Sequence, residues 1–280
     1  MKGFGDRLAE RMADRGPVCT GIDPHAGLLD AWGLEDSAAG VREFGLRTVD
    51  ALWEQTAAFK PQSAFFERHG SRGIAALEDV LEACRQAEVP VIADVKRGDI
   101  GSTMDGYADA YLSGPLRSDA FTVSPYMGTA SLQAAAQRAV EGGQGLFVLA
   151  LTSNAEGPSI QHVGGPGKSV AGRVMEEATR WNRTFAPQAA VGPFGVVVGA
   201  TIGAAATELG IDLAAFPGLF LAPGIGAQGA GSQELREVFG QARSRVLASA
   251  SRSILRGGPT PAGLEESFAR TRDMVLAAVN

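Results

Sequence analysis

The chain has 280 residues, of which 45% are hydrophobic and 20% are charged. A chain of this length can bury a large core without disulfides, and its composition excludes intrinsic disorder. With 31 acidic and 25 basic residues the formal net charge is -6, so no basic field is available to hold a nucleic-acid backbone. We therefore expect a folded protein that does not bind nucleic acid.

Two local features bear on where the protein works. No stretch reaches the 18 apolar residues of a membrane span, and the longest candidate, residues 191–202, is broken by Pro193 and by glycines. The cysteines, Cys19 and Cys84, lie far apart and lack metal-ligand spacing, which suits a reducing compartment. The sequence therefore predicts a cytoplasmic protein without a membrane partner.

The chain alternates short apolar runs with longer stretches of helical spacing, without a break in composition. Residues 1–16 place Leu8, Ala9 and Met12 at helical spacing among charges, which predicts a short helix over about residues 2–15 rather than a secretory signal. The predicted strands are residues 18–23, 57–62, 89–95, 120–124, 145–152, 195–200, 218–222 and 245–250. The main predicted helices are residues 38–53, 71–88, 102–113, 129–141, 169–190, 202–209, 232–243 and 261–279.

Eight strands that alternate with helices predict an α/β protein, a single-domain (β/α)8 TIM barrel over residues 1–280. The strands are near-continuously apolar, which is typical of parallel strands covered on both faces, and a doubly wound open sheet shares that pattern. The polar residues favour the barrel, because they follow different strands and a barrel brings all those C-terminal ends to one mouth. These residues are Asp23, Lys60, Asp94, Lys96, Ser124, Ser153, Thr201, Ser251 and Arg252.

The most informative segment is residues 91–103, VIADVKRGDIGST, where an apolar strand ends in charged residues. The two-residue period of a strand places Asp94 and Lys96 on the same face, toward the mouth, with Asp99 on the loop beyond. A solvated strand edge is the alternative, but an ammonium held between two carboxylates is costly unless it is used. The carboxylates should keep Lys96 protonated, which makes it a poor Schiff-base nucleophile and a good proton donor.

Two other segments end at the same predicted mouth. Lys60 ends a short strand, and its coincidence with Asp94 and Lys96 favours a functional role over an exposed charge. The glycine-rich residues 221–231, LAPGIGAQGAG, follow the seventh strand, and Arg252 follows the eighth. The loops after these two strands form the phosphate site of many barrels, with freed N–H groups and an arginine fork as donors. A phosphate site is therefore predicted here, with a plain glycine-rich turn as the alternative.

Other chemistries lack their motifs. His25, His69 and His162 share no short spacing, so no metal site is predicted. The glycine-rich segment does not match GxxxxGK[ST], and no GxGxxG follows the first strand, so nucleotide and dinucleotide cofactors are not indicated. The long loop over residues 154–168 could cover a substrate or be a plain connection, and we assign it no contacts.

The chain resembles the orotidine 5'-phosphate decarboxylase family, in particular its longer bacterial form. The resemblance covers almost the whole chain and rests on GIDP (21–24), FKPQSAFFE (59–67), DVKRGDIGST (94–103), SPYMG (124–128), LTSN (151–154), APGIGAQG (222–229) and SRSI (251–254). It implies decarboxylation of orotidine 5'-phosphate to uridine 5'-phosphate, the last step of de novo UMP synthesis. The implied reaction forms a C6 carbanion and uses no metal or other cofactor.

The resemblance also implies the catalytic residues. Lys60, Asp94 and Lys96 would join Asp99 of a partner subunit in an array of alternating charge beneath the pyrimidine. Lys96 would donate the proton to C6, and Lys60 would in addition hold a ribose hydroxyl. A homodimer is implied, because Asp99 has to cross the interface.

The same resemblance implies the residues that bind the substrate. Asp23 would hold the ribose, and Thr103 would reach the ribose of the neighbouring subunit. Ser153 would contact the pyrimidine amide. Arg252 and Gln228 would bind the phosphate, Gln228 from a lid formed by the loop after the seventh strand.

Two other functions remain open from the sequence. A Mg²⁺-dependent 3-keto-gulonate 6-phosphate decarboxylase or a hexulose phosphate synthase shares the D-x-K-x-x-D pattern but carries an acidic residue in place of Lys60. Ile100 and Thr103, in the pattern D-I-x-x-T, also favour orotidylate. A catalytically silent phosphate-binding barrel would keep Arg252, but the intact charged array argues against it. A metal-free assay of ultraviolet absorbance, in which orotidylate and uridylate differ, would separate the three.

Overall fold

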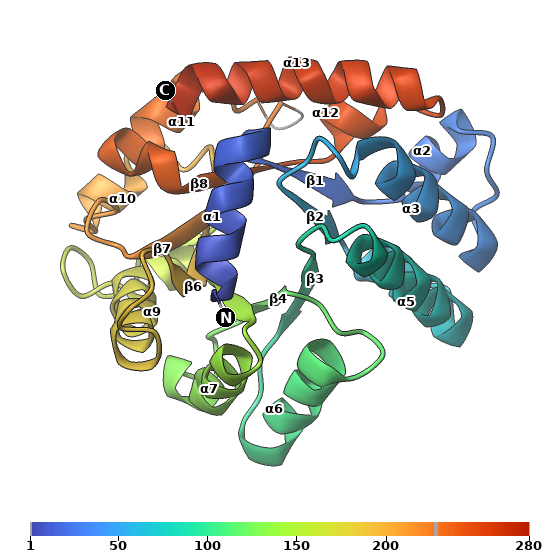
Figure 1. Cartoon of the computed structure of the whole chain (residues 1–280). Helices are drawn as coiled ribbons and strands as arrows, with labels where there is room; N and C mark the ends of the chain where they lie inside the picture. The colour runs from blue at the N-terminus through green and yellow to red at the C-terminus, as the bar shows by residue number, and fades with distance from the viewer. Residues whose placement is uncertain (1, 227–228, 280) are drawn as a thin grey trace.

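Eight parallel strands form the centre of the computed structural model, which describes residues 2–226 and 229–279. They hydrogen-bond in the order β2-β1-β8-β7-β6-β5-β4-β3. Isolated parallel bridges from Phe59 to Val91 and from Gln62 to Asp94 join β2 to β3 and complete the ring, with helices around it (Figure 1). The strands are β1 (Val18–Ile22), β2 (Ala58–Pro61), β3 (Ile92–Arg97), β4 (Ala120–Val123), β5 (Gly145–Leu151), β6 (Gly192–Val198), β7 (Gly218–Pro223) and β8 (Val246–Ala250). The predicted single-domain (β/α)8 barrel is confirmed, and the open doubly wound sheet is excluded because the first strand pairs with the last.

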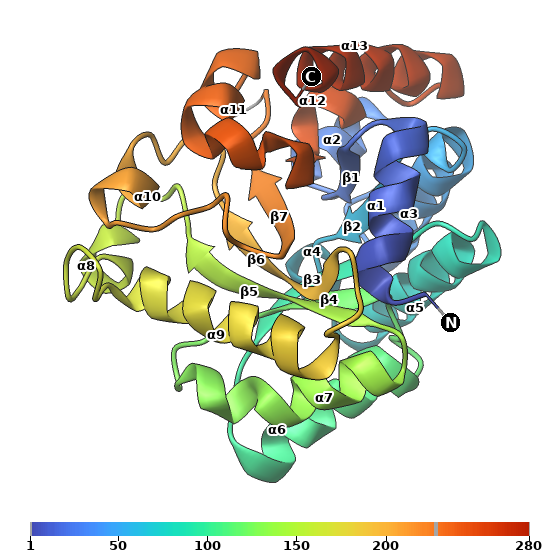
Figure 2. The ribbon, with the colours of Figure 1, turned by 60° about the vertical axis from the view of Figure 1, so that its left-hand side comes forward.

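Helices cover the outside of the barrel, as α7 and α9 cover β5 in Figure 2. The longer ones are α3 (Ala38–Leu52), α5 (Gly70–Gln86), α6 (Gly101–Ala108), α7 (Gln133–Glu141), α9 (Val170–Phe185), α11 (Ser232–Phe239) and α13 (Pro261–Val279). Short helices are α2 (Ala26–Ala31), α4 (Ala64–Glu67), α8 (Pro158–Gln161), α10 (Ala205–Glu208) and α12 (Arg252–Leu255). A π-helical turn, η1 (Asp109–Ser113), and two 3-10 turns, η2 (Thr129–Leu132) and η3 (Gly240–Arg245), complete the set. Within the described ranges no helix has the length and apolarity needed to cross a bilayer.

The helices predicted over residues 169–190 and 202–209 are both longer than those observed. The helix predicted over residues 169–190 ends at Phe185, because Pro187 disfavours helical backbone at Ala186. Ala186 has φ -136° and ψ 55°, outside the helical region. The helix predicted over residues 202–209 forms only as α10, after Gly203 at φ 58°. Local backbone chemistry therefore shortens both elements without changing the order of the fold.

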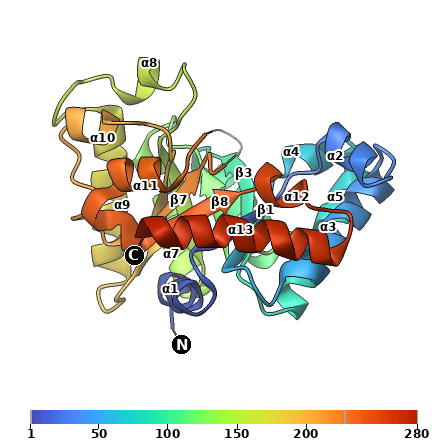
Figure 3. The same ribbon diagram turned by 90° about the horizontal axis from the view of Figure 1, so that it is seen from above.

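Helix α1 (Phe4–Arg15) lies across one end of the barrel (Figures 1 and 3). The ring of Phe4 is buried and meets Phe147 of β5 edge to face, with centroids 6.1 Å apart. A Cβ on Gly5 would lie 2.3 Å from the carbonyl oxygen of Val191, and one on Gly145 would lie 2.4 Å from the Phe4 ring, so glycine permits this close approach. These contacts are made at the N-terminal ends of β5 and β6. Helix α1 therefore closes the end opposite the mouth.

We expect Phe4→Ala to lower the free energy of unfolding by about 3 to 5 kcal/mol, because it removes a fully buried ring and leaves a cavity. The geometry of the mouth should not change, since Phe4 lies at the closed end. Denaturant unfolding of both proteins measures the difference. Phe4→Leu is the matched control and should cost less than about 1.5 kcal/mol. Equal losses in the two variants would contradict this packing role.

Candidate active site

A cavity of about 490 Å³ opens at the C-terminal ends of the strands. Six residues proposed from the sequence line it, namely Asp23, Lys60, Asp94, Lys96, Ser153 and Arg252. The other lining residues are Gln62, Thr122, Leu149, Thr152, Asn154, Gln161, Val197, Leu221, Pro223, Gly224, Ile225, Ser249 and Ser251. Every strand or the loop after it contributes, so the cavity is the mouth of the barrel.

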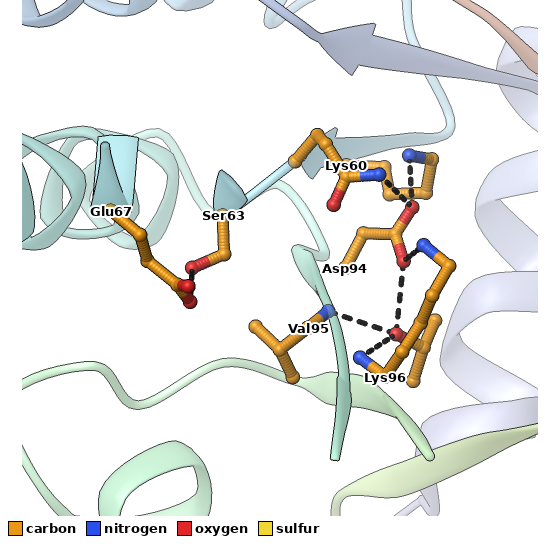
Figure 4. A network of polar contacts seen from close by, with 8 residues as sticks. Lys60, Ser63, Glu67, Asp94, Val95 and Lys96 are labelled. Atoms are coloured by element: carbon orange, nitrogen blue, oxygen red, sulfur yellow. Dashed lines mark hydrogen bonds and ion pairs between the residues drawn. The ribbon is translucent and has the colours of Figure 1, made fainter. Parts of the chain in front are cut away.

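Asp94, in β3, lies between two lysines (Figure 4). Its Oδ2 accepts a hydrogen bond from Lys60 Nζ at 2.7 Å, and its Oδ1 accepts one from Lys96 Nζ at 2.5 Å. Lys60 and Asp94 are buried, at 6% and 7% exposure, whereas the side chain of Lys96 is 45% exposed. Both lysines line the cavity, and Lys96 is the more accessible cation of the array.

The array favours the ionised form of each buried member. Burial by itself would lower the pKa of Lys60, but the carboxylates of Asp94 and Asp23 outweigh it and raise the pKa above its ordinary value. Burial would likewise raise the pKa of Asp94, yet Lys60 and Lys96 outweigh it and hold the pKa well below its usual range. Asp94 is therefore a carboxylate and Lys60 an ammonium at neutral pH.

The array has two further partners, Gln62 and Thr122, that sequence reasoning did not assign. In the orientation that pairs both groups of its amide, Gln62 donates to the main-chain carbonyl of Asp94 at 2.6 Å and accepts from Lys96 Nζ at 3.3 Å. Thr122 Oγ1, from β4, donates to Asp94 Oδ1 at 3.0 Å. Gln62 is the last residue of the FKPQ motif, so its place next to Lys60 in the sequence could have indicated that it belongs to the site. Thr122 stands in an apolar strand, where nothing in the sequence marks its hydroxyl.

The reason given from the sequence for the pairing of Asp94 with Lys96 needs correction. The pleat of a regular strand was expected to place both on one face. Instead, the pairing of β3 with β4 shifts register between Ala93 and Arg97, and Lys96 adopts φ 47°, in the left-handed region. Asp94 and Lys96 therefore meet where the register of β3 shifts, and the two-residue period of a regular strand does not explain their contact.

Asp23, which was predicted to bind the substrate, and Ser251, which was not, carry unpartnered polar atoms at the cavity. Asp23 Oδ1 and Ser251 Oγ are buried without a hydrogen-bond partner among the described residues. Arg252 begins α12 and lines the cavity beside them. Because a buried polar atom without a partner is unfavourable, these groups are suited to binding a polar ligand. Gln228, also predicted here, lies outside the described residues.

Asp99 and Thr103 are the predicted site residues that do not line the cavity of their own chain. Asp99 follows β3, and its Oδ1 accepts from the N–H of Ile100 at 2.8 Å. Thr103 is exposed in the first turn of α6. Ser124 and Thr201, which also follow strands, do not line the cavity either.

The loop after β5, to which no contacts were assigned, folds back onto the end of that strand. Gln161 of α8 accepts from the N–H of Thr152 at 2.9 Å, and its Nε2 lies 2.7 Å from Thr152 Oγ1. Gln161 and Asn154 both line the cavity. The loop is therefore part of the cavity wall beside Ser153, and not only a connection. Within residues 2–226 and 229–279, no group of three His, Cys, Asp or Glu side chains could hold a metal ion.

Comparison with known proteins agrees with this geometry. Residues 16–265 match the model of the orotidine 5'-phosphate decarboxylase / HUMPS family. The chain belongs to this family.

Individual relatives are similar over nearly their whole length. The chain is 50% identical to an orotidine 5'-phosphate decarboxylase of Salinispora arenicola, over 99% of this chain and 97% of that protein. It is 48% identical to one of Streptomyces coelicolor, over 100% of this chain and 99% of that protein. A solved structure from Streptomyces avermitilis, provisionally given the same name, superimposes with a TM-score of 0.92 at 49% identity, covering 100% of this chain and 96% of that one. The resemblance found in the sequence is confirmed.

We expect Asp94→Asn to lower the free energy of unfolding by about 3 to 5 kcal/mol at pH 7, because it leaves Lys60 buried without its nearest counter-charge. The folded-state pKa of Asp94 is depressed, so its contribution is present above the unfolded value of about 3.9 and is lost as the pH falls below it. Urea unfolding from pH 3 to pH 8 measures the difference between variant and parent.

The control for this measurement is Asp79→Asn, at an exposed ion pair with Arg42, which should cost less than about 1 kcal/mol. The difference between Asp94→Asn and the parent should narrow below about pH 4. A difference that stays constant over the whole range would mean that Asp94 is not held ionised by the two lysines.

Proposed function

We propose that this protein decarboxylates orotidine 5'-phosphate to uridine 5'-phosphate and CO₂, the last step of de novo UMP synthesis. The observation that carries the proposal is the array Lys60, Asp94 and Lys96 at the mouth of a barrel of this family. Relatives that are 48% and 50% identical over nearly their whole length carry the name of this decarboxylase. The protein is thus a carboxy-lyase in the proposed reaction.

The chemistry explains why fixed charges are needed. When the bond between C6 and the carboxylate breaks, its electron pair stays on C6 in an orbital in the ring plane, which the π system of the pyrimidine does not absorb. A fixed ammonium at Lys96 stabilises this carbanion and then transfers a proton from Nζ to C6, and Nζ afterwards recovers a proton from water. In this proposal the negative charge of Asp94 faces the carboxylate of the bound substrate and disfavours the ground state.

The remaining residues bind the parts of the substrate that do not react. Asp23 and Lys60 hold the ribose hydroxyls, Ser153 contacts the pyrimidine amide, and Arg252 binds the phosphate together with Gln228. Support comes from the unpartnered Oδ1 of Asp23 and from the position of Arg252 on the cavity wall. Binding energy at the phosphate can assist the reaction at C6 by closing the site around the ring.

The proposed reaction needs no cofactor, because the protein itself supplies the charges. Lys60 Nζ lies 2.7 Å from Asp94 Oδ2. This ammonium supports orotidylate over the substrates of the Mg²⁺-dependent enzymes, for which the resemblance implies an acidic residue at this position. A cytoplasmic location belongs to the same proposal. It is supported by Cys19 and Cys84, which are free thiols, and burial raises the pKa of Cys19 to about 12, so that it stays unreactive.

We further propose that the active unit is a homodimer in which the partner's Asp99 and Thr103 complete each site. Neither residue lines the cavity of its own chain. Exposed apolar side chains lie on the loops after the adjacent strands β3 and β4, namely Ile100 at 57%, Tyr126 at 80% and Met127 at 50% exposure. Large exposed apolar side chains on neighbouring loops favour a contact with another protein surface. A two-fold contact is reciprocal, so two equivalent sites would form.

We expect Lys96→Ala to reduce kcat on the order of 10³-fold or more while leaving the protein folded, because the side chain is half exposed and acts on the transition state. The loss of absorbance as orotidylate becomes uridylate, followed without added metal, measures the rate. Lys2→Ala, which removes an exposed lysine of the N-terminal segment, is the control and should keep full activity. A Lys96→Ala variant that keeps a tenth of the parent rate would contradict the assignment of Lys96 as the proton donor.

Mixing two inactive variants tests the shared site. Homodimers of Lys96→Ala and of Asp99→Ala should each be nearly inactive. After subunit exchange, a hybrid has one site with both residues intact and one that lacks both, so activity should reappear with up to one working site per hybrid. If verified hybrids show no gain over the two parents, Asp99 acts within its own subunit or not at all.

A further inference from the structure

The strand that carries the array is irregular where the array begins. Ala93 of β3 pairs with Phe121 of β4, and Arg97 pairs with Val123, so four residue steps on β3 face only two on β4. The three residues between them, residues 94–96, stand opposite Thr122 alone. Lys96 has φ 47°, a conformation that residues with a Cβ seldom adopt and that surrounding contacts have to hold.

The hydroxyl of Thr122 supplies those contacts. Its Oγ1 accepts hydrogen bonds from the main-chain N–H groups of Val95 and Lys96, both at 2.9 Å. It donates to Asp94 Oδ1 at 3.0 Å. A hydroxyl has two acceptor lone pairs and one proton, so all of its hydrogen-bonding capacity is used. The residue is 1% exposed, and solvent therefore does not compete for these bonds.

One oxygen atom thus connects the backbone of Lys96 with the carboxylate that pairs with its side chain. Asp94 Oδ1 receives both the Thr122 hydroxyl and Lys96 Nζ. Figure 4 shows Asp94, Val95 and Lys96 within this hydrogen-bond network. Loss of the oxygen would leave two N–H groups without an acceptor and would free the left-handed residue to relax, which would displace Nζ from its place over the cavity.

We propose that Thr122 is a positioning residue, whose hydroxyl holds Lys96 in its left-handed conformation and so places the ammonium that protonates the substrate. The proposal rests on the proposed function. Thr122 acts through Lys96 and Asp94 Oδ1. The proposed phosphate and ribose contacts are made by Arg252, by Asp23 and by Lys60, which pairs with the other oxygen of Asp94, and Thr122 has no hydrogen bond to any of the three. Its removal therefore affects turnover and not the binding of uridylate.

The test is Thr122→Val, which keeps the shape of the side chain and replaces the oxygen with a methyl group. We expect kcat for orotidylate to fall about 100-fold, as for a reacting group displaced by about 1 Å. The inhibition constant of uridylate should stay within about threefold of the parent value, because uridylate lacks the reacting carboxylate and keeps the other contacts. Both are measured at 25 °C on protein shown to be folded by circular dichroism.

Two controls separate positioning from a loss of stability. Thr122→Ser keeps the oxygen and should keep kcat within about threefold of the parent. Thr48→Val removes a buried hydroxyl from α3, where it donates to the carbonyl of Phe44 at 2.8 Å, far from the array. It should lower the melting temperature without changing kcat. Should Thr122→Val fail to fold, Thr122→Ala takes its place, since it removes the same oxygen.

Each outcome decides the proposal. Parent-like kcat in the variant that lacks the oxygen would overturn it, and so would an equal loss of kcat in Thr122→Ser. A rise in the uridylate inhibition constant that matches the loss of kcat would also overturn it, because the hydroxyl would then act in binding. The parent protein is assayed in parallel. If the parent itself does not decarboxylate orotidylate, the proposed function fails rather than the role of Thr122.

Discussion

A carboxylate buried between two ammonium groups is the constraint on which the mouth of this barrel depends. Removing Asp94 from water is costly, and only the close approach of Lys60 and Lys96, with hydrogen bonds to the remaining lone pairs, offsets that cost. Such an arrangement is a poor way to stabilise a fold, since apolar side chains would serve as well. It is suited to a site that needs a fixed ammonium with low reorganisation when charge develops on a substrate.

The two ends of the barrel have different roles: one is packed with apolar side chains that stabilise the fold, and the other carries the charged array. At the N-terminal ends of the strands, Phe4 and the rest of α1 fill the opening with apolar side chains. At the C-terminal ends, β2, β3 and β4 bring Lys60, Asp94 and Thr122 together from separate parts of the chain. Because parallel strands all point the same way, their polar ends meet at one mouth while their apolar middles form the core.

The sequence was sufficient to predict the fold and to name most of the charged residues that line the mouth. Eight apolar runs that alternate with stretches of helical spacing predicted the barrel. The charged residues at the ends of these runs, Lys60, Asp94 and Lys96, were predicted to lie together at its mouth. The fold prediction is confirmed, and the three residues lie at one mouth, because the order of the strands along the chain sets where their ends lie in a parallel barrel. Asp99 and Thr103 also stand out in the sequence, and their proposed role depends on a second subunit.

The sequence by itself determined which residues stand at the ends of the strands, and therefore the composition of the mouth. Only the tertiary structure decided how they are held. The register shift between β3 and β4, the left-handed Lys96 and the hydroxyl of Thr122 depend on how two strands pair, and a single threonine in an apolar strand carries no signal of it. The same holds for Gln161, whose contact with Thr152 depends on how the loop after β5 folds back. Periodicity predicts elements, but contacts between elements depend on side-chain geometry in three dimensions.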